Sequence, residues 1–360
     1  GHMKKTRVDE VLNRLERMGL DQIIITDANS IFYLTGIWVD AGERLVALYL
    51  SRHKESCFFV NHMFTLPPDP GVKLVRFSDT DPYLGMLAGC TDRTRPLGVD
   101  KNMPARFLLP LMSMGCGTDY VEASICVDGA RAVKDEEEME AMRRVSAIND
   151  RAMAEFKALL KEGVTEREVS NQIKEIYQRL GADDLSFPPS VCFGANAAIG
   201  HYRCGDVALK RGDCILLDVG CRKDSYCADM TRTFFCGEVS DEEHRRVYEL
   251  VLQANRAAEA VIKPGVRFCD IDAAARKVIE DAGYGDKFTH RLGHFIGIEV
   301  HDFGDVSGAN QETARPGNIF SIEPGIYLEG NVGVRIEDLV LVTGDGCEML
   351  NSYSKELEIV

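Results

Sequence analysis

The pattern of hydrophobic and polar positions divides the first third of the chain into one helix and several strands. Apolar residues recur at helical spacing over residues 4–20, and Gly19 is a suitable end for this helix. Short apolar runs follow, separated by polar or Gly/Pro-containing breaks such as residues 67–71. These runs lie at residues 23–25, 45–50, 57–60, 74–77 and 97–99. The alternation predicts an α/β domain with several strands.

The pattern changes near residue 130, where a charged stretch opens a long helix. We place the domain boundary at about residue 127, which gives an N-terminal domain at residues 4–126 and a second domain at residues 127–360. Residues 1–3 have the sequence left by a cleaved expression tag and are set aside.

The second domain repeats its own pattern. Helices at residues 135–161 and 241–262 are each followed by a Gly-Val turn and a second helix, and these second helices end near Gly181 and Gly283 at one common offset. Histidines and then an acidic hairpin follow each helix pair. This order of elements favours an internal duplication over a chance likeness of two helix pairs.

Composition and charge narrow the class of protein. A hydrophobic share of 45% and a charged share of 28% are those of a soluble globular protein. The chain has 42 Lys and Arg against 57 Asp and Glu, and the resulting net charge of −15 argues against nucleic acid as a partner. No apolar run is long enough for a membrane helix, and no secretory signal follows the tag. Its 12 cysteines form no CxxC pair, so we expect reduced thiols and a cytoplasmic location.

Two aspartates are expected to face each other across the first acidic hairpin. Asp218 ends one apolar run, and Asp229 precedes a run rich in β-branched and aromatic residues. A turn centred between Lys223 and Asp224 would place the two carboxylates opposite each other, about 5 Å apart. Two like charges in this arrangement destabilise a strand pair unless a cation lies between them. The alternative is that one aspartate is a hydrated turn residue.

The second acidic hairpin has the same design. Glu323 follows a buried-strand pattern, and Glu337 lies inside another. A turn centred on Gly330 would place these glutamates opposite each other. Pro324 cannot donate to a strand ladder, so the pairing must be imperfect there. Taken alone, Glu337 could equally be a surface residue.

Four histidines lie immediately before the two hairpins: His201, His290, His294 and His301. A lone histidine near an apolar run is usually a core residue, but here four accompany four carboxylates. One imidazole with four carboxylates suits Mn²⁺, Co²⁺, Fe²⁺ or Zn²⁺ better than a thiolate zinc site would. Two divalent ions balance four carboxylates, whereas one ion would leave a costly negative excess. We therefore predict a two-metal site and a hydrolase.

The chain resembles the creatinase/prolidase/methionine-aminopeptidase superfamily, and within it the Xaa-Pro peptidases. The matching motifs run in order along almost the whole chain. They are Leu-Asp-Val-Gly at 217–220, Asp-Met-Thr-Arg-Thr at 229–233, Gly-His at 293–294, Val-His-Asp at 300–302, Ser-Ile-Glu-Pro-Gly-Ile-Tyr at 321–327 and Val-Arg-Ile-Glu-Asp at 334–338, with further matches at 32–36 and 131–138. The resemblance implies an α+β fold, with an N-terminal creatinase-like α/β domain and a pseudo-symmetric pita-bread catalytic domain, and a homodimer.

The resemblance also implies which residue binds which metal. Asp218 and Asp229 would bind one ion, and Asp229 would also contact the other. His294 and Glu323 would bind that other ion, with Glu337 bridging the two. Mn²⁺ is the first choice, and Co²⁺, Zn²⁺ or Fe²⁺ are the alternatives. The expected substrate is a dipeptide or peptide N-terminus with proline in second position, and neither nucleic acid nor membrane is expected as a partner.

Four residues are expected to carry the chemistry. Glu323 is the candidate base that moves the proton of the attacking water. His201 and His301 would stabilise the oxyanion or protonate the leaving nitrogen. Arg335 is expected on the strand face opposite Glu337. From there it would either hold the carboxylate of Glu323 or Asp229 on the side away from the metal, or contact substrate.

Departures from the family pattern leave alternatives open. Phe295 stands where the family usually has glycine, and its ring would narrow or reshape the pocket. Residues 203–205, Arg-Cys-Gly, stand where the family often has proline. The resemblance to prolidases implies an arginine in the loop after His301 that holds the substrate carboxylate. Arg315 is the only arginine between His301 and Glu323, and it is interpreted as a hydrated turn residue, which weakens a strict dipeptidase interpretation. The alternatives are a non-catalytic peptide- or protein-binding member of the superfamily, and an aminopeptidase or amidinohydrolase of different specificity.

Overall fold

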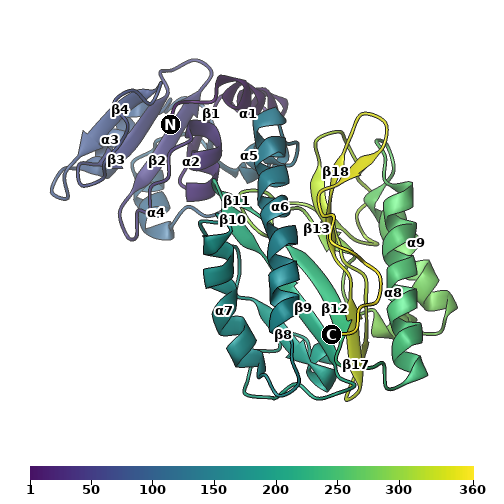
Figure 1. Cartoon of the computed structure of the whole chain (residues 1–360). Coiled ribbons are helices and arrows are strands. Elements are labelled where there is room, and N and C mark those ends of the chain that lie inside the picture. The colour runs from purple at the N-terminus through teal and green to yellow at the C-terminus, as the bar shows by residue number, and fades with distance from the viewer. The chain divides into compact units, whose positions relative to one another are not determined.

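The computed structural model describes all residues, 1–360, and the chain divides into two compact units, Gly1–Arg131 and Ala132–Val360. Figure 1 traces the elements of both units, which are described separately below. None of the helices combines the length and apolar character needed to cross a membrane.

The first unit is a mixed six-stranded sheet with helices packed on it. The sheet has the order β4-β3-β2-β1-β5-β6, and each predicted apolar run forms one of its strands. An apolar cluster that includes Tyr49, Phe59 and Phe107 fills the face covered by α3 and α4. The strands are β1 Gln22–Ile25, β2 Val46–Ser51, β3 Cys57–Asn61, β4 Lys73–Phe77, β5 Leu97–Val99 and β6 Tyr120–Glu122. The helices are α1 Lys5–Arg17, α2 Ala28–Thr35, α3 Tyr83–Cys90, α4 Ala105–Ser113 and α5 Ser124–Arg131.

A buried carboxylate makes the stability of this unit depend on pH. Asp100 is 6% exposed, and burial raises its pKa to about 6, although Thr26 and the backbone N–H of Asp27 donate hydrogen bonds to it. The unfolded residue titrates near 3.9, so between about pH 4 and 6 the native state binds more protons than the unfolded state. The free energy of unfolding should therefore fall by about 3 kcal/mol as the pH rises through this window, and then level off.

Denaturant titrations of the wild type and of Asp100→Asn, followed by fluorescence, measure this effect. Trp38 is the only tryptophan of the chain and lies in the first unit, so its emission reports on the unfolding of that unit. The decline in stability between pH 4 and 6 should be smaller in the variant. An equal decline in both proteins would contradict the prediction.

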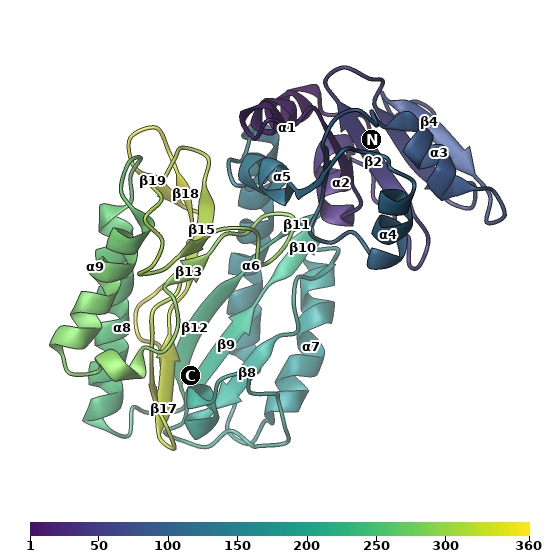
Figure 2. The same cartoon turned by 180° about the vertical axis from the view of Figure 1, so that it is seen from behind.

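The second unit consists of two similar halves, each with a helix pair on the outside and strands on the inside (Figures 1 and 2). The first half contains α6 Glu136–Leu159, α7 Glu166–Arg179, β7 Asp184–Leu185, β8 Ser190–Phe193, the short 3₁₀ helix η1 Gly194–Ala198, β9 Cys214–Val219, β10 Cys221–Lys223, β11 Tyr226–Cys227 and β12 Met230–Phe235. The second half contains α8 Glu242–Val261, α9 Phe268–Asp281, η2 Gly285–Lys287, β13 Gly293–His294, β14 Asp305–Val306, β15 Ile319–Ile322, β16 Gly325–Leu328, β17 Val332–Arg335, β18 Asp338–Val342 and β19 Cys347–Met349.

The two halves begin and turn in the same way. Asp135 and Asp241 cap the first helix of each pair, because each carboxylate accepts a backbone N–H of the first turn. Gly163 and Gly265 then take positive φ, 95° and 90°, and each N–H donates to a carbonyl of the segment that returns toward the strands. The internal repeat predicted from the helix spacing is therefore present in the backbone.

A pair of asparagines occupies the same place in both halves. Asn149 on α6 and Asn255 on α8 are fully buried and follow their helix caps at the same offset. The Asn149 amide donates to the carbonyl of Val219, next to Asp218 in the chain. The Asn255 amide lies within 3.4 Å of the carbonyl of Ile322 and 3.3 Å of that of Ile336. Each half thus fixes the backbone beside its acidic residues from the adjacent helix.

Candidate metal centre

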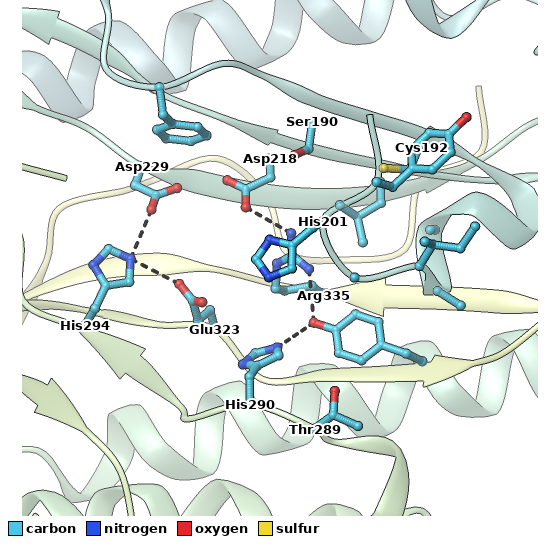
Figure 3. Close-up of a pocket in the computed structure, with 18 of the residues that line it drawn as sticks. Ser190, Cys192, His201, Asp218, Asp229, Thr289, His290, His294, Glu323 and Arg335 are labelled. Carbon is cyan, nitrogen blue, oxygen red and sulfur yellow. Dashed lines mark hydrogen bonds and ion pairs between the residues drawn. The ribbon is translucent and has the colours of Figure 1, made fainter. Parts of the chain in front are cut away.

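The turn of the first acidic hairpin decides where its aspartates lie. Asp224 and Ser225 both have positive φ, 51° and 73°, as in the two-residue turns that suit the twist of a hairpin. With this turn, Asp218 pairs with Thr231. The predicted pairing of Asp218 with Asp229 is wrong, because the turn is centred between Asp224 and Ser225, one position later than expected. A shift of two residues keeps side chains on the same face, and both aspartates point into one space (Figure 3).

The second hairpin has the predicted register. Strand β15 pairs with β18, and β16 with β17, in one common register that places Glu323 opposite Glu337. The ladder is interrupted at Pro324, which has no N–H to donate. The expectation of two glutamates that face each other across an imperfect strand pair is therefore confirmed.

Thr231 joins the two hairpins. The Glu337 N–H donates to the Thr231 carbonyl at 3.1 Å, and the Thr231 hydroxyl donates to Glu337 Oε1 at 2.7 Å. The buried guanidinium of Arg232 holds the same strand, since its Nη1 donates to the Glu337 carbonyl at 2.8 Å. This connection brings the first-half strand β12 alongside the acidic end of the second half. Thr231 had no predicted role, because its contact with Glu337 links segments far apart in the chain.

Four of the five predicted ligands form one cluster. Ligand atoms of Asp229, His294, Glu323 and Glu337 all lie within 4.8 Å of one another. Nε2 of His294 lies 3.2 Å from Asp229 Oδ2, 3.5 Å from Glu323 Oε2 and 3.8 Å from Glu337 Oε2. Asp218 is outside this group of four but lies beside Asp229 (Figure 3).

Negative charge is concentrated in this buried place. Burial, reinforced by neighbouring carboxylates, raises the pKa of Asp218 and Glu337 well above the ordinary range. Burial also acts on Glu323, but hydrogen bonds with Glu337 and His294 outweigh it and lower the pKa of Glu323. Oδ1 of Asp218, Oδ1 of Asp229 and Oε2 of Glu337 are buried without a hydrogen-bond partner. Buried anionic oxygens of this kind are costly, and divalent cations would compensate them, so the donor set fits a metal centre.

The imidazole of His294 is oriented by its own backbone surroundings. Its Nδ1 donates to the carbonyl of Phe295 at 3.0 Å, which leaves Nε2 directed at the carboxylates. Its backbone N–H donates to Ser321 Oγ at 3.0 Å. A Cβ at Gly293 would lie 1.8 Å from the carbonyl oxygen of Ser321, so only glycine allows this approach of the two strands.

A carboxylate on helix α9 holds the segment that leads to His294. Asp272 is 2% exposed and accepts the N–H of Leu292 at 3.1 Å. It also binds Arg276, whose guanidinium donates to the carbonyl of His290 at 2.9 Å. The position of His294 therefore depends on the helix pair of the second half.

A cavity of about 1120 Å³ adjoins the cluster. His201 and His301 both line it, as expected for residues that contact substrate. The ring centre of His301 lies 4.2 Å from that of His294, and burial lowers the pKa of His301, which favours its neutral form. His201 is exposed and has a positive φ of 55°. Other lining residues are Phe187, Ile199, Lys287, Thr289, His290, Tyr327 and Glu329.

Arg335 points into this cavity. Its Nη2 donates to Asp218 Oδ2 at 2.9 Å, and its Nη1 donates to the Tyr327 hydroxyl at 3.0 Å. The expectation that it points away from Glu337 is wrong, because residues two apart in a strand share a face. Tyr327 also lies 2.6 Å from His290 Nε2. Tyr327 had no predicted role, although it lies four residues after Glu323 in the motif at residues 321–327.

Two departures from the family pattern lie away from the cavity. Phe295 is 4% exposed and packs in the core against Phe268 and Phe320. Gly304 makes room for the ring, since a Cβ there would lie 2.9 Å from it. The expectation that Phe295 narrows the pocket is therefore wrong. Arg315 is exposed and does not line the cavity, in agreement with a hydrated turn residue.

Comparison with known proteins places these features in context. Residues 140–344 match the sequence model of metallopeptidase family M24, and residues 7–133 match that of the creatinase/prolidase N-terminal domain. An uncharacterized peptidase of Staphylococcus aureus strain MSSA476 is 34% identical over 97% of this chain and 100% of its own length. A dipeptidase from Pyrococcus horikoshii OT3 superposes with a TM-score of 0.92 at 31% identity, covering 98% of this chain and all of its own. A Xaa-Pro dipeptidase from Bacillus anthracis gives 0.91 at 26% identity, with 99% of each chain covered.

Proposed function

Since the chain belongs to metallopeptidase family M24, with a creatinase-type N-terminal domain and a pita-bread catalytic domain, we propose that it is a dinuclear exopeptidase that hydrolyses Xaa-Pro bonds. The observation that carries this proposal is the cluster of one imidazole and three carboxylates, with Asp218 beside it, next to a peptide-sized cavity; three of the buried carboxylate oxygens lack hydrogen-bond partners. The likeness to dipeptidases and to a Xaa-Pro dipeptidase supports the choice of substrate.

The proposed metal ligands are Asp218, Asp229, His294, Glu323 and Glu337. Divalent ions held there, Mn²⁺ first among them, would supply Lewis acidity to the attacking water and the scissile carbonyl. Arg335 keeps Asp218 in place through the 2.9 Å contact and offsets part of the negative charge of the site.

Protons are moved by side chains that face the cavity. Glu323 lines the cavity beside the other proposed ligands, and one of its oxygens can accept a proton from the attacking water. The proline nitrogen needs a proton before it can leave, and Glu323 can return that proton to it. His301 and His201 line the cavity and can donate hydrogen bonds to the oxyanion that forms at the carbonyl.

Metal analysis combined with an assay on Ala-Pro, Ala-Pro-Ala and Ala-Ala, with added Mn²⁺ or Co²⁺, tests the proposal. We expect cleavage of at least one proline peptide and little or none of Ala-Ala. Cleavage of the dipeptide alone would identify a dipeptidase, and cleavage of both an aminopeptidase. A metal-loaded protein that cleaves neither proline peptide would refute the proposal.

The non-catalytic alternative loses its main support. It rested on Phe295, which packs in the core and does not line the cavity. The homodimer and the cytoplasmic location stay predictions.

A further inference from the structure

The loop between β8 and β9 forms one wall of the cavity and carries His201. Residues 197–202 of this loop line the cavity. His201 lies in the left-handed region at φ 55°, which is unfavourable for residues other than glycine and persists only where the surroundings impose it. The contacts of the loop show which residues hold His201 in this conformation.

One buried carboxylate accepts hydrogen bonds from several parts of the loop. Glu166, at the start of α7, is 0% exposed. It accepts the N–H of Phe193 at 2.8 Å, the Asn196 amide at 3.1 Å, the Tyr202 hydroxyl at 2.5 Å and the N–H of Gly205 at 3.2 Å. The four donors come from the start, the middle and the end of the loop.

Backbone hydrogen bonds from the start of α7 also hold the end of this loop. The N–H of Glu166 donates to the Val207 carbonyl at 3.1 Å, and the N–H of Arg167 donates to the Gly205 carbonyl at 3.0 Å. The Tyr202 hydroxyl accepts the Asn196 amide at 2.8 Å as well, so two loop side chains meet at the carboxylate. Tyr202 is the residue next to His201, and its fixed ring limits how the His201 backbone can rotate.

The chemistry of a carboxylate suits this role. No lysine or arginine pairs with Glu166, so its burial is compensated by hydrogen bonds alone. An ionised carboxylate only accepts, whereas a glutamine presents two N–H donors at one of the two positions. Glutamine would therefore meet the loop donors with donors of its own, at nearly unchanged volume. In the second half, Asp272 on α9 holds the segment before His294 in a comparable way.

We propose that Glu166 is a positioning residue that closes the 193–205 loop and thereby sets His201 in the cavity, an inference that rests on the proposed function of His201. Glu166 does not line the cavity and acts through the loop.

A double-mutant cycle tests this inference. In the wild-type background, Glu166→Gln should lower kcat by on the order of 10-fold on the better proline peptide, with equal metal content and a smaller change in KM. In the His201→Ala background the same substitution should have almost no further effect. Equal losses in both backgrounds would overturn the proposal, because they would show that Glu166 does not act through His201.

Hydrogen exchange gives a readout that does not depend on activity. In Glu166→Gln, the amides of residues 197–202 should exchange at least about 10-fold faster than in the wild type, while those of β12 should not change. Glu168→Gln is the matched control, since Glu168 lies exposed in the same helical turn. Unchanged exchange at residues 197–202 would overturn the proposal even in an active enzyme.

Two further cases are a Glu166→Gln variant that does not fold and a wild type that cleaves neither proline peptide. If Glu166→Gln does not fold, Tyr202→Phe removes one donor to the carboxylate and should give a smaller loss of kcat, again absent in the His201→Ala background. If the wild type cleaves neither proline peptide, the proposed function fails, and the exchange comparison still decides whether Glu166 holds the loop.

Discussion

Asp229→Asn is expected to abolish metal uptake and to lower kcat/KM by at least about 1,000-fold, which corresponds to roughly 4 kcal/mol of transition-state stabilisation. Asp229 lies in the cluster of four ligands, 3.2 Å from His294, and like Glu337 it is expected to contact both ions. An amide has nearly the same volume but carries no charge, so the loss reports on charge and coordination. Metal content by plasma emission spectroscopy and kcat/KM on the better proline peptide measure it.

Asp224→Asn is the matched control for this variant. Asp224 lies in the turn of the same hairpin, at a positive φ that asparagine tolerates. It should keep metal content and kcat/KM within about twofold of the wild type, as expected for a surface change. Full activity of Asp229→Asn with metal bound would refute the proposed ligand set.

Removal of metal from the wild type is expected to lower the free energy of unfolding of the second unit by about 4 kcal/mol per ion, if free metal had exceeded its Kd 1,000-fold. The physical reason is the crowding of buried carboxylates, which raises the pKa of Asp218 and Glu337 and leaves three oxygens without partners. Urea unfolding followed by circular dichroism, with and without a chelator, measures the difference.

Asp229→Asn provides the control here as well. Its free energy of unfolding should be nearly the same with and without the chelator, because this variant is expected to bind no metal. A wild type whose stability is the same with and without chelator would contradict the metal centre.

Much of the fold follows from local patterns in the sequence. Apolar runs predicted strands β1 to β5 of the first unit, whereas the short and partly exposed β6 has no such run; the acidic caps Asp135 and Asp241 lie where the long helices were expected to begin. The register of the second hairpin could be predicted because its turn is centred on Gly330, which has the positive φ that glycine accepts readily. The register of the first hairpin could not be predicted in this way. Its turn residues, Asp224 and Ser225, both have positive φ, and neither is a glycine that would mark the position of the turn.

The candidate site was predictable as a set of residues, but its supporting contacts were not. The link between Thr231 and Glu337, the contact of Arg335 with Asp218 and the hold of Glu166 on its loop all join segments distant in sequence. Such contacts depend on how two hairpins and a helix pack, which residue spacing does not encode. Phe295 illustrates the reverse error, because an unusual residue beside a proposed ligand turned out to face the core.

The matched asparagines Asn149 and Asn255 have a consequence for the history of the chain. Each half holds only part of the cluster, so a half-length ancestor could assemble such a site only by pairing with a second copy of itself. In that pair the site would lie on a two-fold axis, and every residue would be present twice. The four carboxylates of this chain, two from each half, match that symmetry. A single chain is free of the constraint, and here the one imidazole of the cluster, His294, and the cavity arginine, Arg335, both come from the second half.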